Sequence, residues 1–310
     1  MVDIQRILCP IDFSDTSRHA LDHAVAIAKW YQSHITALHV IHPPVLLEPP
    51  ILFADVAGPV PTEAERAAVQ MRLRDWLQRA NTAGLQTDVL LEEGNPAPHI
   101  LECARSLPAD LIVMGTHGRG GFERFMLGSV TEKIVRKATC PVLTVPPPAI
   151  SVAKLPYKRL LCPVDFSESS LAALRFAFSL AKESDAHLTI LHVFDWPPDV
   201  ELLVERFDTP EFRRVVEEEA RGRLEALVTE EARSWCTPDT RVSYGKPYRQ
   251  ILELAGSEGA DLVIIGVRGR NALDLTLFGS TTNQVVRRAS CPVLTLNRSS
   301  RQGIQEAKTV

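Results

Sequence analysis

Glycine and serine recur at fixed intervals in two segments, MGTHGRGGFERFMLGSV (114–130) and IGVRGRNALDLTLFGST (265–281). Each segment has two glycines separated by two residues, and then a glycine followed by serine after nine more. Glycine lets the backbone turn, or approach a ligand, where a Cβ atom would obstruct it. A glycine–serine pair that opens a helix offers free amides and a hydroxyl at the positive end of the helix dipole. The spacing therefore predicts a cradle for a polyphosphate group.

Strand-like and helix-like patterns alternate around these segments, and this alternation implies right-handed crossovers and a parallel sheet covered on both faces. Each half of the chain is predicted to be a doubly wound, five-stranded α/β domain. In the first half, strands are expected at 4–11, 34–41, 86–91, 110–115 and 141–145, and helices at 17–32, 62–83, 97–107 and 129–138. In the second half, strands are expected near 159–164, 187–193, 240–244, 261–267 and 292–296.

The two halves are copies of one unit. Residues 6–40 align without a gap on 159–193, with roughly half of the positions identical, and ATCPVLTV (138–145) aligns on ASCPVLTL (289–296). Matching first and last strands indicate duplication of a complete domain. The expected divisions are a first domain over 1–148, a proline-rich linker over 149–156, a second domain over 157–298 and a flexible tail over 299–310.

With these segments in view, the chain resembles a tandem universal stress protein, and the resemblance covers both halves nearly end to end. The pattern G-x2-G-x9-G-[ST] of the nucleotide-binding members fits both halves without adjustment. The resemblance implies a Rossmann-like fold that binds ATP or AMP beyond the carboxyl ends of the strands. Magnesium is implied only through the nucleotide, with Asp12 or Asp165 beside it, and no metal site is expected from protein side chains alone.

The resemblance also assigns a role to each matching position. It implies an acidic residue beside the nucleoside or its metal, a strand end that reads the adenine edge, a wall for the base, and glycines and a serine that receive the phosphates. In the first half these positions are Pro10, Asp12, Val40, Met114, Gly115, Gly118, Arg119, Gly128, Ser129 and Val130. In the second half they are Pro163, Asp165, Val193, Ile265, Gly266, Gly269, Arg270, Gly279, Ser280 and Thr281.

The first half is predicted to hold the better site. Gly120 and Gly121 align with Asn271 and Ala272, so the second loop is less free to approach a phosphate. Arg124 in turn aligns with Leu275, which removes a cation from the second half.

Several of these residues also have a structural interpretation. Asp12 and Asp165 could cap the following helix, a role also open to Ser14 and Ser17 and, in the second half, to Ser167 and Ser169. His19 and His23 have a spacing compatible with a metal, but no third ligand accompanies them, so a surface pair is expected. His39 and His192 are expected to be hydrogen-bonded interior histidines. The six cysteines form no CxxC pair and are expected to be buried free thiols.

Composition and missing motifs restrict the function. The formal net charge of -4, without a block of Lys or Arg, argues against a nucleic-acid partner. No run of about 18 apolar residues and no leader segment occurs, so a cytoplasmic protein without membrane contact is expected. No GxSxG, HExxH or Walker lysine is present, so no catalytic residue is predicted and the expected chemistry is at most slow ATP hydrolysis.

Assembly is predicted to involve the last strand of each half. Universal stress proteins pair through this strand, which implies an internal pseudo-dimer with 142–145 beside 293–296. The apolar, proline-rich segment 42–61 is interpreted as a lid or a contact surface, and pairing of two chains through it is a hypothesis. The leading interpretation is a stress-response protein that senses a nucleotide and signals to an unknown protein partner. The alternatives are an interaction protein with a vestigial site and a slow ATPase.

Overall fold

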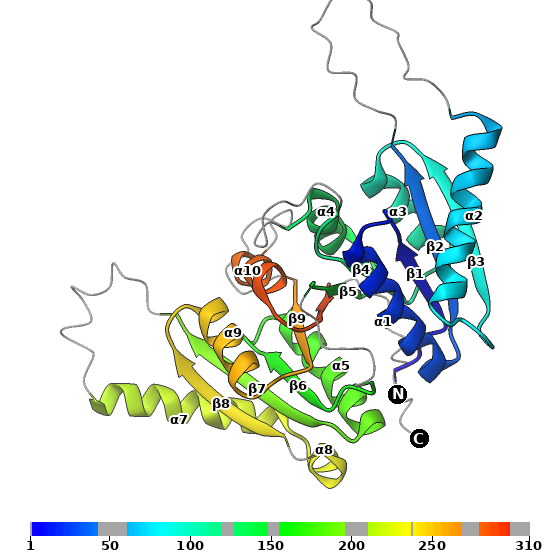
Figure 1. The fold of residues 1–310 in the computed structure, drawn as a ribbon. Coiled ribbons are helices and arrows are strands. Elements are labelled where there is room, and N and C mark those ends of the chain that lie inside the picture. The colour runs from blue at the N-terminus through cyan, green and yellow to red at the C-terminus, as the bar shows by residue number, and fades with distance from the viewer. Residues whose placement is uncertain are drawn as a thin grey trace, which may run out of the picture.

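One continuous sheet runs through both halves of the protein in the computed structural model (Figure 1). The structure describes residues 2–42, 61–118, 127–147, 155–195, 210–236, 238–267 and 279–297. The predicted tail, most of the linker and nearly all of the apolar segment 42–61 lie outside the described residues, as do Arg119, Gly269 and Arg270 of the predicted site.

Helices and strands alternate as the sequence predicts, except in the second half, where two helices follow one another between β7 and β8. The first half contains β1 (Arg6–Pro10), α1 (Asp15–Tyr31), β2 (His34–Ile41), α2 (Glu63–Arg79), β3 (Thr87–Glu93), α3 (Pro96–Ser106), β4 (Leu111–Gly115), α4 (Ser129–Lys137) and β5 (Val142–Val145). The second half contains β6 (Arg159–Pro163), α5 (Glu168–Ser184), β7 (His187–Phe194), α7 (Pro210–Leu227), α8 (Glu230–Trp235), β8 (Asp239–Tyr244), α9 (Pro247–Ser257), β9 (Leu262–Gly266), α10 (Ser280–Arg288) and β10 (Val293–Leu296).

The strand order of the ten-stranded sheet is β3-β2-β1-β4-β5-β10-β9-β6-β7-β8. Within each half the neighbouring strands are parallel. The chain moves outward from β1 to β3 and then crosses back to β4, so the strand order reverses between β1 and β4. In doubly wound folds such a reversal opens a crevice at the carboxyl ends of the two strands. The same reversal occurs between β6 and β9.

The two halves meet where β5 and β10 pair antiparallel, with Leu143 opposite Leu294. The hydroxyl of Thr144 donates to the Val293 carbonyl and that of Thr295 to the Val142 carbonyl, each at 3.1 Å. The predicted pairing of 142–145 with 293–296, and with it the internal pseudo-dimer, is therefore confirmed.

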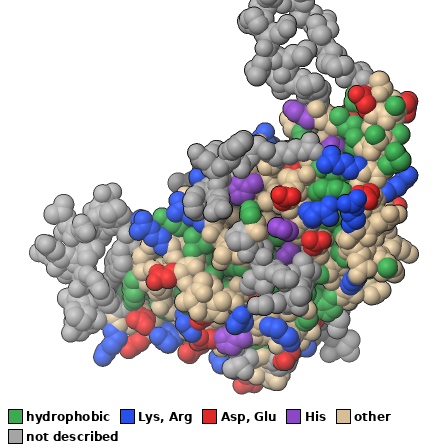
Figure 2. All heavy atoms as spheres, in the orientation of Figure 1, with side chains coloured by type: hydrophobic (Ala, Val, Ile, Leu, Met, Phe, Trp, Pro, Cys, Tyr) green, Lys and Arg blue, Asp and Glu red, His purple; other side chains and the backbone are tan. Residues whose placement is uncertain are grey.

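Helices cover both faces of the sheet. One apolar cluster spans both halves and takes side chains from α1, α2, α5, α7 and α8. On the opposite face the first half has a cluster from α3 and α4, and the second half has one from α9 and α10. All six cysteines are free and buried, as predicted. On the face drawn in Figure 2, acidic and basic side chains are interspersed over the described residues, in keeping with the balanced composition.

Helix caps follow the serines after the first strand of each half. Ser14 accepts a hydrogen bond from the Ser17 amide to begin α1, and Ser167 caps α5 in the same way. The prediction that Ser17 and Ser169 could be caps is wrong, because both lie inside their helices.

Candidate functional site

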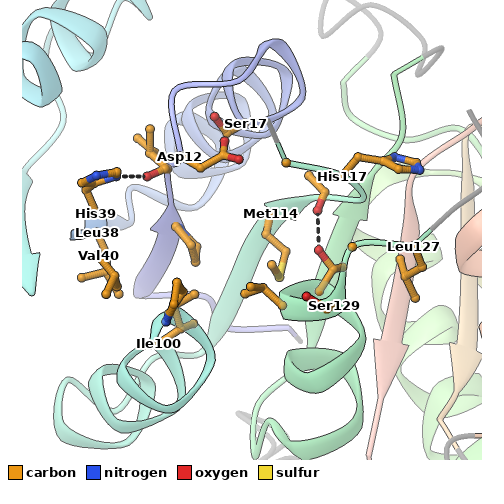
Figure 3. Close-up of a pocket in the computed structure, with 18 residues that line it drawn as sticks. Asp12, Ser17, Leu38, His39, Val40, Ile100, Met114, His117, Leu127 and Ser129 are labelled. Atoms are coloured by element: carbon orange, nitrogen blue, oxygen red, sulfur yellow. Dashed lines mark hydrogen bonds between the residues drawn. The ribbon is translucent and has the colours of Figure 1, made fainter. Parts of the chain in front are cut away.

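A cavity of about 740 Å³ lies at the reversal of strand order between β1 and β4 (Figure 3). Its walls come from the ends of β1, β2 and β4, from the turns after β1 and β4, and from the beginnings of α1, α3 and α4. The lining residues are Pro10, Ile11, Asp12, Ser17, Leu38, His39, Val40, Pro96, Ile100, Met114, Gly115, His117, Gly118, Leu127, Gly128, Ser129, Val130 and Thr131. Every residue predicted for the first-half site lines this cavity except Arg119, which lies outside the described residues.

One end of the cavity is apolar. Val40 at the end of β2 and Met114 near the end of β4 face the same space as Ile100 of α3 (Figure 3). All three side chains are also members of the buried cluster on that face of the sheet, which fixes their positions. A flat apolar group is suited to this end, because burying it leaves no polar atom without a hydrogen-bond partner.

The polar end begins at Asp12, directly after β1. One carboxylate oxygen of Asp12, Oδ1, accepts hydrogen bonds from the Ser14 amide at 3.0 Å and from the Ser14 hydroxyl at 2.6 Å. Ser14 in turn caps α1 through the Ser17 amide. Asp12 therefore orients the serine cap of α1 and is not itself the cap. Its second oxygen, Oδ2, lies beside Gly118.

Phe13 holds this loop in a left-handed conformation, with φ of 64°. That conformation costs a non-glycine residue about 1–2 kcal/mol, so it needs support from its surroundings. The guanidinium of Arg72 lies 4.1 Å from the centre of the Phe13 ring, and Trp76 meets the ring edge-on at 5.3 Å. Helix α2 thus holds the turn that aims the Asp12 carboxylate. Phe166, with φ of 62° and Arg223 at 3.9 Å, repeats the arrangement in the second half.

The two glycines after β4 have different roles. A Cβ on Gly118 would lie 2.6 Å from Oδ2 of Asp12, inside the cavity. A Cβ on Gly115 would lie 3.0 Å from backbone and side-chain atoms of Thr16, at the start of α1. Gly118 therefore keeps space open beside the carboxylate, whereas Gly115 allows α1 to pack closely against the end of β4.

Helix α4 presents its amino end to the cavity without a side-chain cap. The Gly128 amide is already used by the Thr116 carbonyl at 2.9 Å, and the Thr131 hydroxyl donates to the Gly115 carbonyl at 2.9 Å. These two bonds fix the helix start against the end of β4. The next residues, Ser129 and Val130, line the cavity at the helix end where the dipole favours an anion.

His117 forms the wall nearest the second half. Its Nδ1 is hydrogen-bonded to the Thr116 hydroxyl at 2.8 Å, and its carbonyl accepts from the Thr16 hydroxyl at 2.5 Å. Burial, and secondarily the charge of Arg287 on α10, lower the pKa of the imidazole. The ring is therefore held neutral at pH 7.

A sequence model of the universal stress protein family matches residues 3–146 and, separately, residues 156–297. The chain belongs to the universal stress protein family. The universal stress protein MJ0531 of Methanocaldococcus jannaschii is 36% identical over 144 residues, which cover 46% of this chain and 83% of that protein. The universal stress protein Rv2005c of Mycobacterium tuberculosis is 28% identical over 268 residues, covering 86% of this chain and 88% of that one.

Among solved structures, a universal stress protein from Archaeoglobus fulgidus has a TM-score of 0.66 and 23% identity to this chain. The likeness covers 94% of this chain and 98% of that one. At this identity it shows the fold, which is the tandem arrangement of two universal stress protein units predicted from the sequence.

The second half of this universal stress protein repeats the polar end of the site. Asp165 accepts from the Ser167 amide at 3.0 Å and from its hydroxyl at 2.6 Å, as Asp12 does with Ser14. Gly279 opens α10 without a side-chain cap, and the Thr282 hydroxyl bonds the Gly266 carbonyl at 2.8 Å. The other predicted positions that the structure describes occupy matching places: Pro163 ends β6, Val193 lies in β7, Ile265 lies in β9, and Ser280 and Thr281 open α10.

Some predictions about histidines need correction. His23 is 3% exposed, and its Nδ1 lies 3.3 Å from the Tyr157 hydroxyl, so the predicted surface pair with His19 is wrong. Residue 23 lies on the face of α1 that packs into the core, which the four-residue spacing could not reveal. His39 and His192 do hydrogen-bond to buried backbone, through the Ile11 and Val164 carbonyls at 2.6 and 2.7 Å.

Sequence reasoning missed the walls supplied by α3 and by Leu127, which lies two residues before α4. Pro96 and Ile100 could have been found from the repeat, because Pro247 and Ile251 occupy the same positions in α9. Leu127 carries no comparable signal, since its role depends on how the two halves pack.

The described residues contain no group of three or more His, Cys, Asp or Glu side chains that could hold a metal ion. Asp12 could therefore act on a metal only together with ligands that another molecule brings. None of the helices in the described ranges is long and apolar enough to span a bilayer.

Proposed function

We propose that the first-half cavity binds an adenine nucleotide, ATP or AMP, and that this universal stress protein is a nucleotide-dependent sensor whose bound state a protein partner reads. The observation that carries the proposal is the pairing of an apolar slot with an uncapped helix end in one cavity of about 740 Å³. That volume lies within the range of roughly 300–1,000 Å³ typical of small-molecule sites.

The base is assigned to the apolar end and the phosphates to the polar end. Val40, Met114 and Ile100 provide a slot for a flat heterocycle, and the backbone at Val40 is proposed to recognise its edge. Gly118 leaves room for phosphate oxygens, which the amides at the start of α4 can then bind. Asp12 would repel these oxygens directly, so it is assigned to the ribose hydroxyls or to magnesium.

Magnesium fits this site only as part of a nucleotide complex. The ion usually keeps several waters and binds through one or two carboxylates together with substrate phosphates. Asp12 supplies one carboxylate, with its Oδ2 beside Gly118, and one carboxylate is enough for such a complex. A weaker second site at the equivalent residues of the second half is part of the same proposal.

Calorimetry of the full chain with ATP and magnesium tests the proposal, with Gly118→Val as the variant. Valine at 118 would occupy the space beside Asp12, so we expect ATP affinity of the first-half site to fall by at least about tenfold, or 1.4 kcal/mol. Gly256→Val is the matched control, because a Cβ at Gly256 meets no atom within 4 Å. No heat of binding in the unmodified protein, or unchanged affinity in folded Gly118→Val, would contradict the proposal.

A further inference from the structure

Helix α4 is held at its carboxyl end by the second half of the protein. The side-chain amide of Asn297, which directly follows β10, donates to the Ala138 carbonyl at 3.0 Å and to the Arg136 carbonyl at 3.4 Å. These are among the last carbonyls of α4, which have no partner within the helix. Asn297 is only 7% exposed, so the contact is buried in the interface between the two halves. This interface, which centres on the paired strands β5 and β10, is called the seam.

The seam is asymmetric at this point. The aligned strands place Pro146 in the first half where Asn297 stands in the second. Proline has no side-chain donor, so it cannot cap α10 in return. The first-half helix that faces the cavity is therefore tied to the other half by a bond that its counterpart lacks.

The amino end of α4 also meets the second half. Leu127, which lines the cavity and lies two residues before the helix, packs against the second-half cluster that includes Val285 and Ile251. In the opposite direction, Val267 of the second half belongs to the first-half cluster around α3 and α4. Both ends of a helix about 14 Å long are thus positioned by the other half.

Three polar side chains, each with a buried atom, lie near the place where α10 approaches His117. Nε2 of His117, Nε of Arg287 and Oε1 of Gln284 are buried and lack a hydrogen-bond partner among the described residues. Gln284 and Arg287 lie three positions apart, on one side of α10. Among the described residues, buried polar atoms of both halves therefore gather where α10 approaches His117.

We propose that the second half positions the phosphate-binding end of the first-half cavity, with Asn297 and the α10 surface holding α4 in place. This inference rests on the proposed nucleotide site. An anion bound at the amino end of α4 requires that helix in one position, and the contacts with the second half favour that position. Because linkage is reciprocal, a nucleotide in the first half must then strengthen the packing of α4 on the second half by the same factor.

The first test compares two single hydrogen bonds across the seam. Asn297→Ala removes the cap on α4, and we expect it to weaken ATP binding at the first-half site about fivefold or more, the lower end of typical couplings. Thr295→Val removes the bond to the Val142 carbonyl, which also crosses the seam but does not touch α4. We expect Thr295→Val to stay within about twofold of the unmodified protein. Equal affinities in the unmodified protein and folded Asn297→Ala, or equal losses in both variants, would overturn the inference.

The second test needs no change at the seam. At an ATP concentration that fills the first-half site but not the weaker second-half site, ATP should slow amide hydrogen exchange in α10 (Ser280–Arg288) as well as in α4, and the effect on α10 should vanish in Gly118→Val. Protection confined to the first half would overturn the inference and leave the nucleotide site standing. Protection of α10 that persists in Gly118→Val would assign it to a second-half site and would also overturn the inference. Absence of ATP binding in the unmodified protein would remove both proposals.

Discussion

Asp12 combines a structural and a proposed functional role in one carboxylate. Its Oδ1 is committed to Ser14, and its Oδ2 faces Gly118. The sequence left open whether this residue serves a helix cap or a ligand, and the geometry lets each oxygen do one of the two. A side chain that is already fixed loses little further entropy when it binds a ligand.

His117 makes the stability of the protein depend on pH in a defined direction. Burial, followed by Arg287, lowers its pKa, so between that value and about 6.5 the folded protein binds fewer protons than the unfolded chain. Stability contributed by neutral His117 is therefore present above about pH 6.5 and is lost as the pH falls through the lowered pKa.

His117→Gln should remove this dependence. As the pH falls from 7.5 to 5, we expect the unmodified protein to lose more unfolding free energy than the variant. Urea denaturation at several pH values measures it, and the other histidines cancel because both proteins contain them. A difference independent of pH would show that the imidazole is not desolvated in the folded state.

Glycine spacing led to the cavity because position 118 has no room for a side chain: a Cβ there would lie 2.6 Å from Oδ2 of Asp12. Leu127 shows the limit of such reasoning. It lines the cavity because it packs on the second half, and no local pattern records that contact. His23 was misplaced for the same reason, since its partner, Tyr157, lies 134 positions away.

At the scale of elements, periodicity and alternation predicted every described strand, and the largest error lies at a helix end. Helix α2 was expected to reach residue 83 but ends at Arg79. Asn81 and Gly84 adopt left-handed conformations, with φ of 56° and 83°, and turn the chain toward β3. Asparagine and glycine tolerate that conformation, so the two residues were the available signal for the earlier end.

The repeat supplies a matched pair of helix caps that separates stability from binding. Ser14→Ala and Ser167→Ala each remove an N-cap hydroxyl bonded to an aspartate, and we expect each to cost about 1 kcal/mol of unfolding free energy. Only Ser14→Ala removes the hydroxyl that orients the Asp12 carboxylate, so only this variant should also weaken ATP binding in the first half. Denaturation and calorimetry on both variants provide the comparison. Equal effects of the two substitutions on ATP affinity in the first half would contradict a role for Asp12 in binding.

At the scale of the whole molecule, the seam between the halves has the symmetry of a two-fold interface. Leu143 and Leu294 are equivalent residues in the repeat and lie opposite one another, with Val142 facing Thr295 and Thr144 facing Val293. Such an arrangement is self-complementary, because the same strand can serve on either side. The sheet's outer edges, β3 and β8, instead carry charged side chains such as Asp88 and Arg241, which discourage further pairing.

The self-complementary seam predicts the behaviour of the first half alone. A fragment of residues 1–147 would expose β5, which is fully buried in the intact protein, as an apolar edge. Two copies could restore the ladder with Leu143 opposite Leu143 of the second copy, so we expect a homodimer at micromolar concentration by light scattering.

The intact chain covers β5 with its own β10 and should not pair by this route. A folded fragment with a monomeric mass would mean that the pairing depends on features of the second half that the first half lacks. Asn297, which donates two hydrogen bonds to carbonyls at the end of α4, is the specific candidate, because Pro146 cannot replace those bonds. Adding the Pro146→Asn substitution to the fragment would then be expected to restore the dimer, since each copy could cap the other's α4.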